Sequence, residues 1–277
     1  MTPTRTFPQT KGGDYKRSAN PLALVTSASS GIGFELARQC ALYGFDLLIV
    51  ADEPEIRDAA LRLEAEGARV QSIEADLSTI EGVNRLLAVA GRRPVDALLA
   101  NAERGLGKAF VDQDFAAIRH VIAANVTGMA YLVHQVARQM RALGRGRILI
   151  TGSIAGFLPG SYQAVYNATR AFLDSFAHAI RAELKDSGVS VTCLMAGSSD
   201  TDFFQGADRL DTGVGPSGKD DPAEVAASGF RAMMAGDGEV VTGWQDRLRA
   251  AIANVPRAGV VAGQHRQRAE PAPAYKK

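Results

Sequence analysis

Residues 22–34, LALVTSASSGIGF, join a continuous apolar run to a turn rich in serine and glycine. A short apolar run of this kind is typical of a strand that is buried on both faces of a sheet. The spacing that follows predicts a helix beginning near Gly31 and Gly33, where free backbone N–H groups and the helix dipole attract a phosphate. Ordinary tight turns also contain such glycine pairs, so the meaning of this one depends on the rest of the chain.

The alternation of apolar runs and helical segments continues to about residue 242. It predicts one α/β domain: a single Rossmann-like, doubly wound parallel sheet of about seven strands with helices on both faces. We expect a flexible N-terminal extension at 1–20, the α/β domain at 21–255 and a polar C-terminal tail at 256–277. Further strands are expected at 46–51, 69–75, 95–100, 147–152 and 189–197, and long helical stretches at about 112–142 and 162–187.

Composition excludes several classes of protein. The 277 residues carry a formal net charge of +1, which argues against nucleic acid or an anionic membrane as the main partner. No apolar run approaches the roughly 18 residues that span a membrane, and the polar opening lacks the apolar core of a secretory signal. A cytoplasmic protein is expected, with Cys40 and Cys193 as buried free thiols. The four histidines are scattered, so no metal site is predicted.

Further motifs follow the first loop, TSASSGIG (26–33), in order along residues 22–201. They are EADLS (74–78), ANAE (100–103), NVTG (125–128), GSIAG (152–156), YNATR (166–170) and MAGSSDT (195–201). Together these motifs resemble those of the short-chain dehydrogenase/reductase family, and the resemblance implies a NAD(P)-dependent Rossmann-fold enzyme, with its NAD(P)-binding domain at 21–255. It also leads us to expect a homodimer or homotetramer built through the two long helical stretches.

The resemblance implies four catalytic residues: Asn125, Ser153, Tyr166, and Arg170 at the position where the family has lysine. A tyrosine can exchange a proton with the substrate oxygen, a serine can orient that oxygen, and a cation one helical turn away favours the phenolate. Each residue also has an ordinary interpretation. Ser153 could be a loop residue, Tyr166 a packing residue, Asn125 a helix residue bonded to backbone, and Arg170 part of the helix surface.

The cofactor is expected to be NAD in preference to NADP. Asp52 directly follows the second strand, where a carboxylate accepts hydrogen bonds from the adenosine ribose hydroxyls and repels a 2′-phosphate. Alternatively, Asp52 caps the next helix, with Pro54 in its first turn. The resemblance places the cofactor against Ser27, Ser29, Ser30, Gly31, Ile32, Gly33, Asp52, Asp76, Leu77, Asn101, Ala102, Tyr166, Arg170, Gly197 and Thr201.

Two functions stay open because the chain departs from the family pattern at four positions. Ser27 and Glu103 replace glycines, Ala196 replaces a proline, and Arg170 replaces the lysine. Glu103 would put a negative charge near the nicotinamide-side ribose. The first function is an oxidoreductase that interconverts a small-molecule secondary alcohol and a ketone or aldehyde. The second is a catalytically impaired relative that binds a dinucleotide or serves as a scaffold.

The loop at 198–221 is the expected cover of the substrate pocket. Phe203 and Phe204 suggest an apolar part of the substrate, or else they pack a short helix onto the domain.

Overall fold

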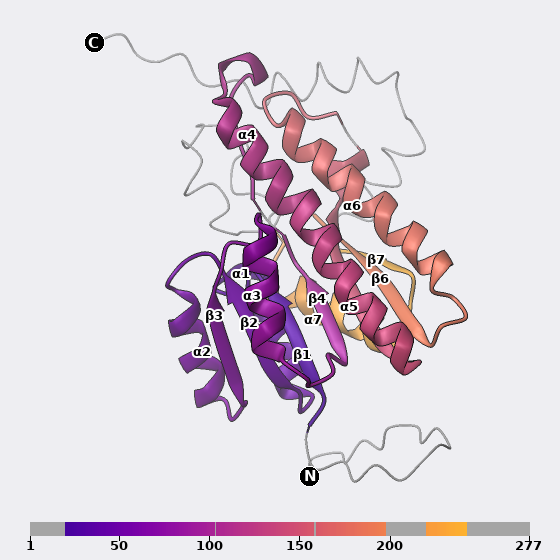
Figure 1. The fold of residues 1–277 in the computed structure, drawn as a ribbon. Coiled ribbons are helices and arrows are strands. Elements are labelled where there is room, and N and C mark those ends of the chain that lie inside the picture. Colours follow the sequence, from indigo (N-terminus) through magenta and orange to yellow (C-terminus); the bar gives the residue numbers. More distant parts are fainter. Residues whose placement is uncertain (1–19, 103, 158, 198–219, 243–277) are drawn as a thin grey trace.

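The computed structural model describes residues 20–102, 104–157, 159–197 and 220–242 (Figure 1). Within these residues seven parallel strands form one sheet in the order β3-β2-β1-β4-β5-β6-β7, which confirms the predicted Rossmann-like fold. The strands are β1 (Leu22–Thr26), β2 (Asp46–Ala51), β3 (Val70–Glu74), β4 (Ala97–Ala100), β5 (Gly146–Ser153), β6 (Val189–Ala196) and β7 (Glu239–Val241).

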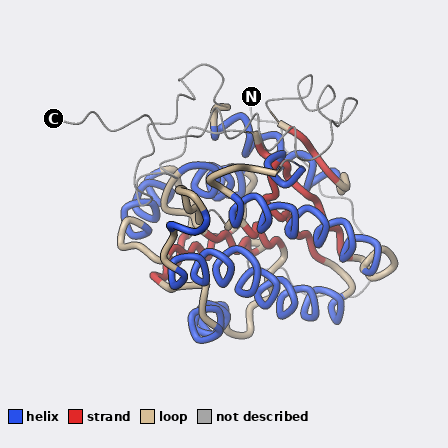
Figure 2. Tube along the Cα trace, turned by 90° about the horizontal axis from the view of Figure 1, so that it is seen from above, coloured by secondary structure: helices blue, strands red, loops and turns tan. Residues whose placement is uncertain are grey.

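Helices cover both faces of the sheet, as Figure 2 shows from above. One hydrophobic core lies between the sheet and α1, α2 and α7, and the other lies between the sheet and α3, α5 and α6. The helices are α1 (Gly31–Leu42), α2 (Ile56–Ala65), α3 (Ile80–Ala90), α4 (Phe115–Ile122), α5 (Met129–Leu143), α6 (Ala164–Glu183) and α7 (Pro222–Ala235). Three short elements join them: η1 (Phe110–Asp112), η2 (Ala123–Gly128) and η3 (Ile154–Phe157).

The centre of the sheet places the functional site. From β1 the chain adds β2 and β3 on one side and β4 to β7 on the other, so the order reverses between β1 and β4. A crevice opens at such a point, outside the carboxyl ends of the strands. The two strand ends are joined here by Thr26, whose Oγ1 donates to the carbonyl of Asn101 and accepts from its N–H, both at 2.9 Å.

The predicted helical stretch at 112–142 is one continuous helix, α4–η2–α5, interrupted by the π-helical turn η2. Single π-helical turns often mark functional positions. The stretch Phe115–Leu143 is long and apolar enough to cross a membrane, with a mean hydropathy of 1.3. Its buried face, which includes Leu132, Val136 and Met140, packs on the sheet as that of a core helix does. That the chain has no membrane partner stays a prediction.

The two cysteines are buried and free, as predicted. The expected N-terminal extension and C-terminal tail lie outside the described residues, apart from Asn20, and the expected loop at 198–221 does so except for Asp220 and Asp221. Phe203 and Phe204 are therefore not placed. The domain boundaries stay predictions.

Candidate active site

The first loop is shaped to let another group approach its backbone. A Cβ atom on Gly33 would lie 1.9 Å from the carbonyl oxygen of Ser27 and 3.0 Å from Nδ2 of Asn101. Gly31 has a φ of 55°, a left-handed conformation that glycine adopts without strain. Ser30 is the N-cap of α1, but its side chain makes no capping bond. The first backbone N–H groups of α1 are therefore not capped by this side chain, and N–H groups at a helix N-terminus suit a phosphate.

Ser27 has a φ of 49°, also in the left-handed region. This is the position where the family usually has glycine. A side chain in this conformation costs on the order of 1 kcal/mol, because Cβ approaches the following carbonyl oxygen. Serine in place of glycine thus introduces a small local backbone strain at Ser27.

Asn101 supports a ligand at the same place. Its side chain is buried, and within the described residues neither Oδ1 nor Nδ2 has a hydrogen-bond partner. Buried amides are nearly always bonded, so an unpartnered one calls for an explanation. Together with the close approach at Gly33, the free amide of Asn101 fits the nicotinamide dinucleotide that the resemblance implies.

At the adenosine end of the expected cofactor site, polar and charged side chains bind one another. Arg104 forms an ion pair with Asp52, and Oγ of Ser29 donates to the carboxylate of Glu53. Helix α2 begins after Glu55, which is its N-cap residue, so the alternative that Asp52 caps this helix is wrong. Asp52 is available for a ribose, provided that Arg104 releases it.

Asp76 lies beside this pair. Burial raises the pKa of its carboxyl, but hydrogen bonds from Ser78 and the charges of His120 and Arg104 outweigh that effect, so the pKa lies below its usual range. One carboxylate oxygen each from Asp52 and Asp76 and a ring nitrogen of His120 lie within 4.8 Å of one another, as the ligands of a metal ion could. One of these carboxylates, that of Asp52, is paired with Arg104. The expectation that the chain binds no metal stays a prediction.

Ser153 is the last residue of β5 and is only 7% exposed. Its Oγ donates to the carbonyl oxygen of Ala196 at 3.1 Å and accepts from the N–H of Ala155 at 3.1 Å. Gly197 follows β6, whose last residue, Ala196, is the register partner of Ser153. The hydroxyl is therefore held in one orientation by backbone groups.

Arg170 is the cation beside Tyr166. Both lie on α6, and Cζ of Arg170 lies 4.8 Å from the centroid of the tyrosine ring. Arg170 is 2% exposed, so the alternative that it belongs to the helix surface is wrong. Its Nη1 donates to the carbonyl oxygen of Thr151 at 3.2 Å, and its Nε has no hydrogen-bond partner among the described residues. The guanidinium is thus fixed against β5 and over the ring.

Asn125 lies in η2 and connects two parts of the site. Its Oδ1 accepts from the N–H of Arg104 at 3.2 Å, and its Nδ2 donates to the carbonyl of Arg104 at 2.7 Å and to Oγ1 of Thr169 at 3.1 Å. The alternative of a backbone-bonded helix residue is therefore correct. These bonds also join the loop after β4 to the helix that carries Tyr166.

Asp174 is a buried acid at the site that the motifs did not reveal. It is 5% exposed, and Oδ1 accepts from the N–H of Ser153 at 3.2 Å. Burial raises the pKa of its carboxyl to about 6, although the bond from Ser153 and the charge of Arg170 oppose this. The available signal was its spacing, four residues after Arg170 and eight after Tyr166.

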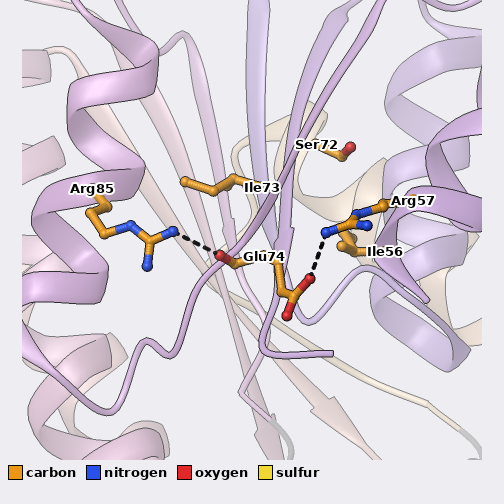
Figure 3. Close-up of a pocket in the computed structure, with 6 residues that line it drawn as sticks. All are labelled: Ile56, Arg57, Ser72, Ile73, Glu74 and Arg85. Atoms are coloured by element: carbon orange, nitrogen blue, oxygen red, sulfur yellow. Dashed lines mark hydrogen bonds and ion pairs between the residues drawn. The ribbon is translucent and has the colours of Figure 1, made fainter. Parts of the chain in front are cut away.

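Two expected site residues, Glu103 and Thr201, lie outside the described residues. A separate hollow of about 480 Å³ lies at the β3 edge of the sheet, lined by Ile56, Arg57, Ser72, Ile73, Glu74 and Arg85 (Figure 3). It contains none of the expected site residues. The candidate active site is instead the point between β1 and β4 where the strand order reverses, near the glycine loop and the unpartnered amide of Asn101.

Comparison with known proteins gives concordant matches. Residues 21–210 match the family model described as short chain dehydrogenase. An uncharacterized oxidoreductase of Myxococcus xanthus is 34% identical over 180 residues, 63% of this chain and 70% of that protein. The short-chain dehydrogenase from Sphingobium yanoikuyae in complex with NADPH has a TM-score of 0.76 at 26% identity, over 92% and 100% of the two chains. The bulky-bulky ketone specific alcohol dehydrogenase from Comamonas testosteroni has a TM-score of 0.74 at 25% identity, over 94% and 98%.

Proposed function

Because the chain belongs to the short-chain dehydrogenase family, a family of oxidoreductases, we propose that it interconverts a secondary alcohol and a ketone or aldehyde with NAD(P). One observation carries the proposal: the buried guanidinium of Arg170 lies over the ring of Tyr166, on the helix that follows Ser153. A tyrosine needs a neighbouring cation to act as a base near neutral pH. Here the replacement of lysine by arginine keeps such a cation in place.

The chain's own residues would move the proton. The bound dinucleotide would supply or accept the hydride. In oxidation, the phenolate of Tyr166 removes the hydroxyl proton of the alcohol while Ser153 donates a hydrogen bond to the same oxygen. In reduction, Tyr166 returns that proton to the carbonyl oxygen. Arg170 favours the phenolate throughout, and Asn125 holds the tyrosine helix against the loop after β4.

For the cofactor we propose NAD in preference to NADP. The support is the carboxylate of Asp52 at the end of β2, which suits two ribose hydroxyls and repels a 2′-phosphate. Arg104 offsets part of that repulsion through its ion pair with Asp52. The related Sphingobium structure contains NADPH, so both forms belong in the binding assay.

The second candidate, a dinucleotide-binding protein without turnover, is favoured by two other contacts. The hydroxyl of Ser153 donates to Ala196, and a donor of Arg170 is engaged by Thr151. If substrate and cofactor do not displace these bonds, the site binds but does not react. Cofactor binding without turnover would then be the result.

The test uses the purified chain, with reduced-nicotinamide absorbance followed over a panel of ketones, aldehydes and secondary alcohols. We expect turnover with at least one apolar ketone, and we expect Tyr166→Phe to lose turnover while it still binds NADH. NADH binding without turnover on the whole panel would establish the second candidate. Failure to bind either NADH or NADPH would contradict both.

We also propose a homodimer or homotetramer in the cytoplasm. Large apolar side chains lie exposed on the helices of one layer, among them Phe115, Ile122 and Phe172, and they supply a surface for a second copy. Light scattering after size exclusion, with Phe172→Glu as the disrupting variant, measures the assembly.

A further inference from the structure

Three residues share one face of α6 at helical spacing: Tyr166, Arg170 and Asp174. The first two form the proposed proton-transfer pair. The third is buried against the end of β5, where its Oδ1 accepts from the N–H of Ser153 at 3.2 Å. Asp174 therefore touches the backbone of one proposed catalytic residue and shares a helix face with the other two.

Two glycines lie directly against this carboxylate. A Cβ atom on Gly152 would lie 1.8 Å from Oδ1, and one on Gly156 would lie 2.3 Å from Oδ2 of the same side chain. Two glycines in the GSIAG motif thus border the acid. A buried carboxylate is costly unless it is paired, so an acid enclosed in this way calls for a reason.

The charged and titratable groups facing Asp174 come from two elements. On α6 they are Arg170 and His178, and His178 forms an ion pair with Glu239 when protonated. On β6 the thiol of Cys193 donates to Oδ1 at 3.6 Å. Arg170 has no carboxylate within ion-pair distance in the described part of the chain, and Oδ2 of Asp174 has no hydrogen-bond partner there. Both groups are buried, and on α6 the charge of Arg170 opposes the rise in the pKa of Asp174 more than that of His178 does.

We propose that Asp174 is a positioning residue that fixes Ser153 and whose negative charge partly offsets that of Arg170 at Tyr166, thereby setting the pH at which Tyr166 ionises. The effect of Asp174 on catalysis rests on the proposed function. Its effect on the ionisation of Tyr166 can be measured without any turnover. Eight helical residues separate Asp174 from Tyr166, about 12 Å along the axis. At an effective dielectric constant of about 20, one charge at that distance changes the phenolate equilibrium about tenfold, or about one pH unit.

The first experiment tests how the negative charge of Asp174 alone affects the ionisation of Tyr166. Asp174→Asn keeps the size and the Oδ1 acceptor for Ser153 but removes the negative charge. The matched control is Glu183→Gln, the same change at an exposed residue of the same helix, about 25 Å from Tyr166 and beyond the screening length. Phenolate formation is followed by ultraviolet difference absorbance, each protein being read against its own Tyr166→Phe version.

We expect the midpoint of Tyr166 ionisation to fall by about one pH unit in Asp174→Asn and to stay unchanged in Glu183→Gln. Equal midpoints in all three proteins would overturn the electrostatic part. Because this titration uses neither cofactor nor substrate, it decides the matter even if the protein proves inactive and the proposed function fails.

The second experiment tests whether Asp174 positions Ser153. Asp174→Ala removes the acceptor for the Ser153 N–H as well as the charge. We expect kcat to fall at least tenfold below that of Asp174→Asn, with KM changed less than twofold, when both are assayed at their own optimal pH. Equal kcat values would overturn the positioning role. If Asp174→Ala does not fold, Asp174→Ser, which can keep a hydroxyl acceptor, takes its place in the comparison.

Discussion

Replacing Arg170 by methionine should abolish activity at neutral pH while sparing activity in strong alkali. The change removes the guanidinium over the Tyr166 ring and keeps a long side chain that fills the buried space. The guanidinium carbon lies 4.8 Å from the ring centroid. With the phenolate charge placed at that centroid, an effective dielectric constant of about 20 gives about 3.5 kcal/mol of attraction. This corresponds to about 2.5 pH units.

The assay is kcat against pH for alcohol oxidation, with any accepted substrate. We expect the alkaline limb of the Arg170→Met profile to move up by about 2.5 pH units, so that kcat at pH 7 falls about 300-fold. Arg170→Lys is expected to do the opposite and to raise kcat roughly tenfold at neutral pH. An ammonium is a compact charge that can approach the tyrosine oxygen, whereas the guanidinium is engaged by Thr151.

The control is Arg181→Met on the same helix. Arg181 also donates to backbone carbonyls, those of Val191 and Gly236, but it lies about 16 Å from Arg170 along the axis. The Arg181→Met protein should be less stable, but its profile of kcat against pH should not shift. A profile that is unchanged in Arg170→Met, or a slower Arg170→Lys enzyme, would refute the assignment of Arg170 as the tyrosine's cation.

Three further outcomes follow from the described contacts. Ser27→Gly should raise the free energy of unfolding by up to about 1 kcal/mol in denaturant titrations, because it relieves a φ of 49°, whereas Ser29→Gly should not. Arg104→Gln should raise the preference for NADH over NADPH about tenfold in fluorescence titrations, and Asp52→Ala should reverse it. The folded-state pKa of Asp174 is raised from 3.8 to about 6, so its stabilising contribution is present below pH 3.8 and lost as pH rises through 6. Asp174→Asn should therefore be more stable than the parent at pH 8, by up to about 3 kcal/mol, and the gain should shrink by pH 4. Equal stabilities at pH 8 would contradict this.

Strand positions were the most predictable part of the fold. The expected strands at 22–26 and 46–51 coincide with β1 and β2, since a strand buried on both faces is a continuous apolar run with sharp ends. The edge strand β3 is shorter than the expected 69–75, because an edge is only partly buried. The π-helical turn in the middle of the long helix has no signature in apolar spacing, which continues through it.

The site residues that belong to sequence motifs could be predicted. The contacts between residues far apart in the sequence could not. The YNATR spacing placed Arg170 one turn from Tyr166, and the structure puts the guanidinium over the ring. The pair of Arg104 with Asp52 joins residues 52 positions apart, and only the sheet order brings them together. Asp174 has the helical spacing of Tyr166 and Arg170, but its contacts with Gly152 of β5 and Gly156 of η3 could not be read from that spacing.

The central place of β1 also has a consequence for synthesis on the ribosome. Its partner on one side, β2, follows closely, but its partner on the other, β4, pairs Ala23 with Ala97. At about 5–20 residues per second, roughly 4–15 s pass between the synthesis of Ala23 and that of Ala97. After β2 has emerged and until β4 does, the buried strand β1 has one unpaired edge, the kind of surface that recruits other nascent chains. The nascent chain is therefore most in need of a chaperone between the completion of β3 and the arrival of β4.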